Sequence, residues 1–319
     1  MIYETLIYGI SIIIIALIID MILGEVPNKI HPVIYMGNMI SKLKDYLPKT
    51  KFSGLLIILT TTFTFTIITL IILIIFAFIN QWLFIIIAAL ILSTTFSINF
   101  LIESVRKIQK ELSQDINIAR KSMSYLVSRD TSELTESRIT SAAIETLTEN
   151  ITDSIISPLF YTTIFSLIFG IIIGICVAII YRVSNTMDAM LGYTTEELID
   201  IGRYPAKWDD VLNYIPARIT GYYVVLSSLI LRYDYKQSYD VMKKFANKTP
   251  SPNSGYPMAA TAGALNITLV KEGVYTLGYG NDELNKEKIS EAIKITKVTS
   301  ILFILTIIII YFILMLLFM

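Results

Sequence analysis

The chain alternates between long apolar runs and shorter polar segments. A membrane-spanning helix needs about 20 mainly apolar residues. Five runs reach about that length: Ile2–Leu23, Leu55–Ile79, Leu83–Ile102, Ile155–Tyr181 and Val298–Phe318. A weaker run, Val211–Leu231, is interrupted by Pro216 and Arg218. The pattern predicts an all-α, polytopic integral membrane protein with about five or six membrane helices.

The basic residues between the runs predict their orientation. The uncharged Asn80-Gln81-Trp82 joins the second run to the third, which predicts a tight hairpin turn there. The other ends of these runs, and the start of the last one, adjoin segments rich in lysine and arginine. Such segments stay in the cytoplasm. We therefore expect helical cytoplasmic segments at about 24–54, 103–154 and 232–297, within a single membrane-embedded domain covering residues 1–319.

The run Ile155–Tyr181 allows two interpretations. It is long enough to cross the membrane once, which would place Arg182–Asp210 on the outer side. Gly170 and Gly174 could instead break it into a re-entrant helical hairpin, because broken backbone is tolerated at membrane depth where it packs against protein. The sequence leaves both interpretations open.

Three carboxylates stand immediately before and at the start of this run. Glu145, Glu149 and Asp153 are spaced i, i+4, i+8, so an α-helix would stack them on one face. Like charges at i, i+4 repel by about 0.2–0.5 kcal/mol per pair. A metal ion or an arginine among them would explain the spacing, and oxygen ligands of this kind suit Mg²⁺. We predict a Mg²⁺ site here, with a solvent-facing acidic stripe as the alternative.

Two polar residues flank the end of the first run. Asp20 lies inside the run, and a carboxylate at membrane depth is a functional candidate, although an acid near the interface can also reach water. His31 precedes Pro32, which favours an extended backbone at His31. An isolated histidine is usually structural, but its place beside an intramembrane acid also makes it a candidate site residue.

We call Glu145, Glu149 and Asp153 the acidic ladder. Arg129 precedes this ladder in the sequence, and its guanidinium suits the recognition of phosphate or carboxylate groups. A solvated arginine is the simpler alternative. The following Asp130-Thr131 predicts a helix N-cap, with Glu133 at the third position of a capping box.

Further polar groups follow the run Ile155–Tyr181. Arg182, Asn185 and Asp188 are spaced i, i+3, i+6, so they share one face of a helix. Five other polar residues are candidates. Asn150 lies beside the ladder, Asp210 and Asn213 lie at the start of the weak run, Arg218 lies within that run, and Asn253 lies in a Pro/Gly turn.

Composition supports the membrane class and narrows the chemistry. The chain is 54% hydrophobic and 16% charged, against about 45–50% and 25% in soluble domains. Its net charge is zero, which gives no reason to expect a nucleic-acid partner. One cysteine and one histidine exclude a disulfide framework and histidine-rich metal centres. The sequence contains no glycine-rich Walker loop for a nucleotide.

The polar blocks together resemble the CbiB/CobD family of membrane-bound adenosylcobinamide-phosphate synthases. Six blocks match in order from Asp20 to Leu265: DMILGEVPNKIHPVIYMG, SRDTSEL, IETLTENITDSIISPLFY, YRVSNTMDAMLGY, DDVLNYIPARITG and SPNSGYPMAATAGAL. The resemblance implies an enzyme of cobalamin biosynthesis in the cell membrane. It would join aminopropanol, or its phosphate, to the free propionate carboxylate of adenosylcobyric acid, using ATP and Mg²⁺, at a cytoplasmic-side active site.

The resemblance also implies roles for the candidate residues. The expected catalytic residues are His31, Glu145, Glu149, Asn185, Asp188 and Asp210. The expected substrate-binding residues are Asp20, Arg129, Asn150, Arg182, Asn213, Arg218 and Asn253. The expected Mg²⁺ ligands are Glu145, Glu149 and Asp153. Arginines and Mg²⁺ would stabilise charge on the activated carboxylate, and His31 or a ladder carboxylate would accept a proton from the amine.

Membrane lipid is an expected partner, together with a second copy of the chain or later enzymes of cobalamin assembly. Two other functions remain open. One is a non-catalytic membrane sensor resembling the AmpE branch, which would use the pocket only to bind a ligand. The other is a transporter, because Asp20 and Arg218 could line a pathway through the membrane. The absence of inverted hydropathy repeats from the sequence disfavours a transporter.

Overall fold

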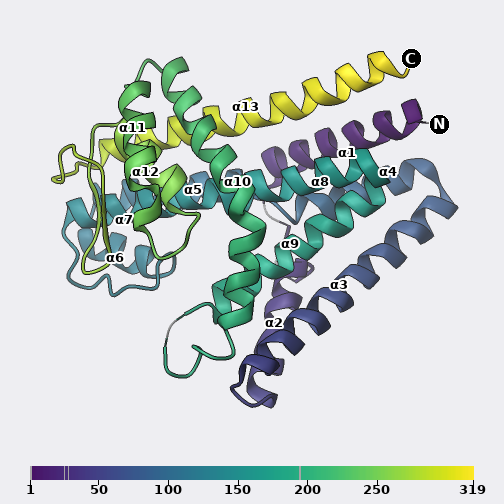
Figure 1. The fold of residues 1–319 in the computed structure, drawn as a ribbon, viewed down its shortest axis with the longest axis horizontal. Helices are drawn as coiled ribbons and strands as arrows, with labels where there is room; N and C mark the ends of the chain where they lie inside the picture. The colour runs from purple at the N-terminus through teal and green to yellow at the C-terminus, as the bar shows by residue number, and fades with distance from the viewer. Residues whose placement is uncertain (1, 25, 28, 194) are drawn as a thin grey trace. The chain divides into compact units, whose positions relative to one another are not determined.

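The computed structural model describes residues 2–24, 26–27, 29–193 and 195–319, and it is almost entirely helical (Figure 1). The first part of the chain forms α1 (Ile2–Leu23), α2 (Pro32–Tyr46), α3 (Lys51–Ile79), α4 (Gln81–Ser93), α5 (Asn99–Leu112) and α6 (Ile116–Ser124). The middle forms α7 (Glu136–Ile151), the π-helix η1 (Thr152–Ile156), α8 (Ser157–Phe169), α9 (Ile171–Leu191) and α10 (Arg203–Ile230). The last part forms α11 (Tyr235–Phe245), the 3₁₀ helix η2 (Ala246–Lys248), α12 (Gly255–Ala264), β1 (Leu269–Lys271), β2 (Tyr275–Leu277) and α13 (Glu287–Leu317).

Five helices in the described part of the chain are long and apolar enough to cross a membrane. They are Tyr3–Leu23, Lys51–Ile79, Glu136–Phe169, Ile171–Leu191 and Glu287–Leu317. The prediction of an all-α polytopic membrane protein is confirmed. The sequence pattern did not predict the antiparallel pair β1–β2, in which Val270 faces Thr276.

Two predicted spans have different boundaries in the structure. The run Leu83–Ile102 is divided between α4 and α5, so the prediction of one helix there is wrong. Thr94 and Thr95 donate their hydroxyls to the carbonyls of Ile91 and Leu92, which occupies the last acceptors of α4. With 13 residues, α4 is about 20 Å long, against about 30 Å of bilayer hydrocarbon.

The weak run Val211–Leu231 forms the second part of α10, which continues through Pro216. It is not among the five helices that could span a membrane.

The predicted hairpin turn after α3 is confirmed, because Asn80 ends α3 and its side chain accepts hydrogen bonds from the backbone N–H groups of Trp82 and Leu83 at the start of α4.

The run Ile155–Tyr181 forms a helical hairpin, so its interpretation as one continuous crossing is wrong. Gly170 has φ +88°, a conformation open to glycine, and the chain reverses there between α8 and α9. The two helices lie side by side (Figure 1), with the rings of Tyr161 and Tyr181 stacked at 5.8 Å. A Cβ on Gly174 would lie 2.8 Å from Cβ of Ser166, so glycine permits the close approach. Whether this hairpin crosses or re-enters the membrane stays a prediction.

The chain divides into two compact units. Unit 1 comprises residues 1–97, 157–212 and 307–319, and unit 2 comprises residues 98–156 and 213–306. A core of unit 1 is formed where α2, α3 and α9 meet, around the fully buried Met36, Ile57, Val183 and Met187. In unit 2, α7 packs against α5, α6, α12 and β1, and most of its residues from Ile139 to Ile151 are buried.

Candidate functional site

The predicted site residues fall into clusters, one in unit 1 and two in unit 2. The first cluster in unit 2 surrounds Glu145, a buried carboxylate on α7. Nη2 of Arg129 lies 3.3 Å from each oxygen of Glu145. The Ser141 hydroxyl donates to Oε1 over 2.7 Å, and the Tyr275 hydroxyl donates to Oε2 over 2.8 Å. The charge of Glu145 is therefore balanced by one arginine and solvated by two hydroxyl donors.

The small β-sheet positions this network. The Ser141 hydroxyl accepts from the backbone N–H of Val270 over 3.0 Å, which fixes β1 on α7. The turn between the strands contains Gly273 with φ +70°, and it brings Tyr275 on β2 back towards Glu145. Burial and the nearby charges of Glu145 and Glu149 raise the pKa of Tyr275 far above its usual range. The phenol therefore stays protonated and acts as a donor.

The acidic ladder differs from the predicted stack. Regular α-helix ends at Ile151, and Asp153 lies in the π-helix η1, so only Glu145 and Glu149 keep the α-helical i, i+4 relation. The cation beside the ladder is Arg129, the alternative to a metal ion. Among the described residues, no three acid, histidine or cysteine side chains are grouped to hold one metal ion. A Mg²⁺ site made by all three carboxylates therefore does not fit this geometry, and the Mg²⁺ requirement itself stays a prediction.

Two other sequence predictions near the ladder need correction or detail. Asp130 does not cap α7: its carboxylate accepts from the backbone N–H of Ser132 over 2.9 Å, and the cap is Thr135, which accepts from Arg138. The chain turns once more before the helix starts at Glu136. Asn150 donates its side-chain amide to the carbonyl of Thr146 in its own helix over 2.8 Å.

Arg218 forms the second cluster of unit 2. Its Nη1 donates to the carbonyl of Tyr214 over 2.7 Å and to Oδ1 of Asn253 over 3.1 Å. Its guanidinium lies 3.5 Å from the ring centre of Tyr214 and 4.3 Å from that of Tyr256. Arg218 thus holds the turn of residues 251–254 on α10, which explains an arginine in an apolar helix. The predicted Asn213, one turn earlier, is also buried.

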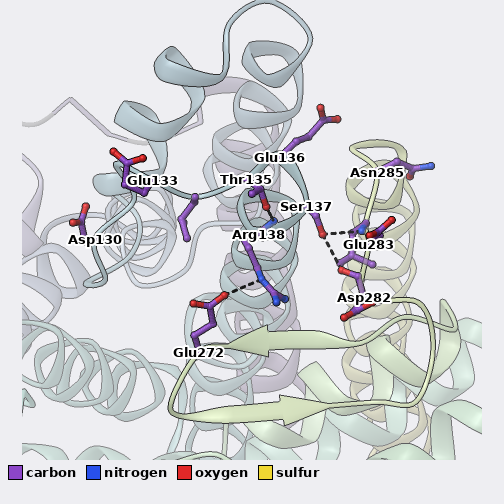
Figure 2. Close-up of a pocket in the computed structure, with 12 residues that line it drawn as sticks. Asp130, Glu133, Thr135, Glu136, Ser137, Arg138, Glu272, Asp282, Glu283 and Asn285 are labelled. Carbon is purple, nitrogen blue, oxygen red and sulfur yellow. Dashed lines mark hydrogen bonds and ion pairs between the residues drawn. The ribbon is translucent and has the colours of Figure 1, made fainter.

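Unit 2 also contains a cavity of about 1000 Å³ that the sequence did not reveal (Figure 2). Its lining carries six carboxylates and one arginine, contributed by Asp130, Glu133, Glu136, Arg138, Glu272, Asp282 and Glu283. Arg138 pairs with Glu272 over 3.2 Å, and the Ser137 hydroxyl donates to the carbonyl of Asp282 over 2.8 Å. None of the predicted site residues lines it.

The unit 1 cluster begins with His31, which is buried and caps α2. Its Nδ1 accepts from the backbone N–H of Val33 over 3.2 Å, so the neutral ring carries its proton on Nε2. Burial and the positive charge of Arg182 lower the pKa of His31 below its usual range. A general base needs a free lone pair, but the lone pair on Nδ1 of His31 already accepts the hydrogen bond from Val33. The prediction that His31 accepts a proton is therefore not supported by this geometry, and His31 serves as a cap and an Nε2–H donor.

Charged groups of both signs lie on one face of α9. Nη1 of Arg182 donates to Oδ1 of Asn185 over 3.4 Å, and the carboxylates of Asp188 and Asp210 are close enough to interact electrostatically. Gly192 caps α9, and a Cβ there would collide with the Asp188 carboxylate. Arg182 and Asp188 are six residues apart, or about 9 Å along the helix.

The α8–α9 hairpin holds the start of α10 in place. The Tyr161 hydroxyl donates to the carbonyl of Leu212 over 2.8 Å, two residues after Asp210. Asp20, on α1, is buried in the same unit. The arrangement offers a cationic group for an anion at Arg182 and a pair of carboxylates for a cation at Asp188 and Asp210.

The cap at His31 predicts a specific dependence of stability on pH. An unfolded histidine titrates near pH 6.5. Because the fold lowers this pKa, the unfolded state binds the proton more readily, so stability is lost as the pH falls from about 7.5 to 5.5. His31→Asn keeps a capping side chain without the titration. We expect the melting temperature of the wild type to fall relative to that of His31→Asn as the pH falls through this range. The chain has only 1 histidine. A difference in melting temperature that does not change with pH would therefore contradict the role of His31 as a neutral cap.

Removing the Tyr275 hydroxyl tests the Glu145 network. Tyr275→Phe keeps the ring but leaves Oε2 of Glu145 with one donor fewer. Hydrogen bonds to charged groups contribute about 1.5–3 kcal/mol. We expect a loss of that size in the free energy of unfolding, measured by chemical denaturation in micelles, whereas Tyr279→Phe, with an exposed ring, should cost under about 0.5 kcal/mol. Equal losses for the two variants would show that the hydroxyl does not stabilise Glu145.

Sequence reasoning gave an arginine as one of two possible cations for the ladder, but it assigned Arg129 to substrate binding and missed Tyr275 as a partner of Glu145. Tyr275 follows Glu145 by 130 positions, so no local spacing connects them. The only local signal was Gly273 between two short segments with apolar residues, which is typical of a hairpin.

Comparisons with known proteins agree with this picture. The family model described as "CobD/Cbib protein" matches residues 13–305. The chain is 41% identical over 290 residues to the "Probable cobalamin biosynthesis protein CobD" of Methanothermobacter thermautotrophicus, covering 91% of this chain and 94% of the relative. It is 35% identical over 298 residues to the "Cobalamin biosynthesis protein CobD" of Listeria monocytogenes serotype 4b, covering 89% and 92%. No solved structure matches the chain.

Proposed function

The chain belongs to the CobD/CbiB family of cobalamin biosynthesis proteins, and from that premise we propose that it is an amide-forming ligase. It joins the amine of aminopropanol, or of aminopropanol phosphate, to the free propionate carboxylate of adenosylcobyric acid. The product is adenosylcobinamide or its phosphate.

The observation that supports this proposal is the presence of both a cation, Arg182, and an acid, Asp188, on α9. Amide formation must bring together a carboxylate and an amine, which are oppositely charged near neutral pH. Arg182, joined to Asn185, presents a cationic group suited to a carboxylate. Asp188 and Asp210 present neighbouring carboxylates, whose mutual repulsion is relieved when an ammonium lies beside them.

The residues have distinct roles in the proposed reaction. Arg182 and Asn185 hold the propionate, with Nε2–H of His31 as a nearby donor. Asp188 or Asp210 accepts a proton from the ammonium, which frees the nitrogen lone pair to attack the carboxyl carbon. One carboxyl oxygen leaves as the C–N bond forms. ATP, when bound, supplies the activation that makes this oxygen a good leaving group.

The roles predicted for the remaining residues are also proposals. Arg218 keeps the turn with Asn253 in place for substrate, and Arg129 orders Glu145 and its neighbours for the same purpose. Contacts of Asp20, Glu149, Asn150, Asp153 and Asn213 with substrate, or of Glu149 and Asp153 with Mg²⁺, are part of the same proposal. So are a cytoplasmic-side site, inferred from the basic segments, and association with a second copy or with later cobalamin-assembly enzymes.

The proposal is tested with the purified full-length protein. It is incubated with adenosylcobyric acid, Mg²⁺-ATP and either aminopropanol or its phosphate, and the corrinoid mass is followed. We expect a mass increase that corresponds to condensation, and none when ATP or Mg²⁺ is omitted. Corrinoid binding without any amide product would overturn the ligase and favour a membrane sensor.

A further inference from the structure

A second cavity, distinct from the polar clusters, lies in unit 1 on the surface of α3. It has a volume of about 630 Å³ and is bounded by α3, α9 and the first half of α10. Its lining is Leu55, Ile58, Leu59, Thr62, Phe63, Thr66, Ile67, Ile180, Tyr204, Lys207, Trp208 and Val211. We call this cavity the α3 groove. Lys207 is the only charged residue in its lining.

The walls of the α3 groove are those of a site for a hydrocarbon chain. Its residues on α3 recur every three or four positions from Leu55 to Ile67, so they form one stripe that is apolar except for Thr62 and Thr66. Twelve residue steps on a helix cover about 18 Å. One leaflet is half of a bilayer core of about 30 Å, or about 15 Å. The groove thus matches the length of an acyl chain in a single leaflet.

The lysine, tyrosine and tryptophan of the lining gather at one end of the groove. Gly54, at the start of α3, lies against Pro205 of α10, with 3.4 Å between its ideal Cβ position and Cδ of Pro205. Lys51 pairs with Asp200 over 3.6 Å in the same region. The start of α10, which carries Tyr204, Lys207 and Trp208, therefore meets the basic start of α3. Tyrosine, tryptophan and lysine at one end of an apolar stripe are typical of the membrane–water interface.

The positive charge of Lys207 at this end of the α3 groove favours a lipid with an anionic headgroup. Lys207 is exposed and forms no ion pair with a residue that the structure describes. A lysine at the surface of an anionic leaflet is attracted to its phosphates. Among the five described helices that could span a membrane, α3 is the least covered by protein, because only 11% of its most apolar segment is buried.

From these observations we propose that the α3 groove binds one anionic membrane lipid. Its hydrocarbon chain lies along the stripe from Leu55 to Ile67, and its phosphate lies beside Lys207. The site is separate from the residues proposed for amide formation. It would attach the start of α10, which also carries Asp210, to the inner leaflet.

The chain provides its own reporter for this site. It has 2 tryptophans, and Trp208 lines the groove while Trp82 lies at the start of α4. Trp82→Phe therefore leaves Trp208 as the only tryptophan. The full-length variant is placed in phosphatidylcholine nanodiscs that contain a small fraction of lipid with brominated chains, which quench tryptophan on contact. The brominated lipid is phosphatidylglycerol in one sample and phosphatidylcholine in the other.

We expect brominated phosphatidylglycerol to quench Trp208 several-fold more than the same fraction of brominated phosphatidylcholine. Adding Lys207→Gln should remove this difference, whereas Lys121→Gln, an exposed lysine in unit 2, should leave it. Thr66→Phe, which fills the groove, should reduce quenching by both lipids. In Trp208→Phe, the remaining Trp82 should respond equally to both lipids.

Equal quenching of Trp208 by the two lipids would overturn the anionic site. A preference that survives Lys207→Gln would overturn the placement of the headgroup at Lys207. Since Lys207 is on the surface, this variant tests the proposal even if Thr66→Phe fails to fold.

Discussion

Replacing Arg129 by methionine is expected to lower the free energy of unfolding by about 3–5 kcal/mol. The substitution removes the cation that pairs with Glu145 in the part of the chain that the structure describes, and the side chain of Glu145 is only 6% exposed. An unpaired carboxylate at that position either stays charged at a high desolvation cost or takes up a proton. The loss would be measured by chemical denaturation of the purified protein in mixed micelles, followed by circular dichroism.

Two further variants make this prediction specific. Arg129→Met with Glu145→Gln removes both charges and keeps a group that can bond to Ser141 and Tyr275, so most of the stability should return. Arg106→Met breaks the more exposed pair with Glu103 in the same unit and should cost about 1 kcal/mol or less. If Arg129→Met costs no more than Arg106→Met, the buried pair does not have the role assigned to it.

Replacing Arg182 by methionine is expected to lower kcat/KM for amide formation by about 10²–10³-fold. The variant loses the cation that we propose for the propionate, while methionine keeps an unbranched aliphatic side chain at the same position on α9. Asp188→Asn should give a loss of similar size by weakening the site for the amine. Both rates are measured from corrinoid product at saturating ATP.

Matched controls separate this effect from general damage. Arg182→Lys keeps the positive charge but loses the planar donors, so it should recover part of the rate. Asp200→Asn removes an exposed carboxylate of the same unit and should leave the rate near that of the wild type. Wild-type rates in folded Arg182→Met and Asp188→Asn proteins would show that the charges on α9 are not the substrate site.

The apolar runs predicted the fold class and most spans, but they could not locate every helix end. Run length does not reveal that hydroxyls of Thr94 and Thr95 occupy the last carbonyls of α4. The reversal at Gly170 was one of two interpretations, because hydropathy is the same for a glycine at a turn and a glycine inside a helix. Strands β1 and β2 are three residues each, too short for alternation to show.

Local spacing carried part of the information about these polar clusters, and the roles of their residues stay predictions. The i, i+4 acids predicted a cation, either Mg²⁺ or an arginine, and in the structure Arg129 pairs with Glu145. The i, i+3, i+6 spacing placed Arg182, Asn185 and Asp188 on one face of a real helix. What spacing could not give were contacts over long sequence separations, such as Tyr275 with Glu145, or the use of one ring nitrogen of His31 by a helix cap.

The central claim is that this chain forms the amide bond itself, and one labelling measurement tests it most directly. The purified protein is given adenosylcobyric acid, Mg²⁺-ATP and aminopropanol phosphate labelled with ¹⁵N, and the corrinoid is analysed by mass spectrometry. We predict a condensed corrinoid that retains the ¹⁵N label in the wild type and is nearly absent with Arg182→Met. Unchanged adenosylcobyric acid after incubation with the wild-type protein would contradict the account.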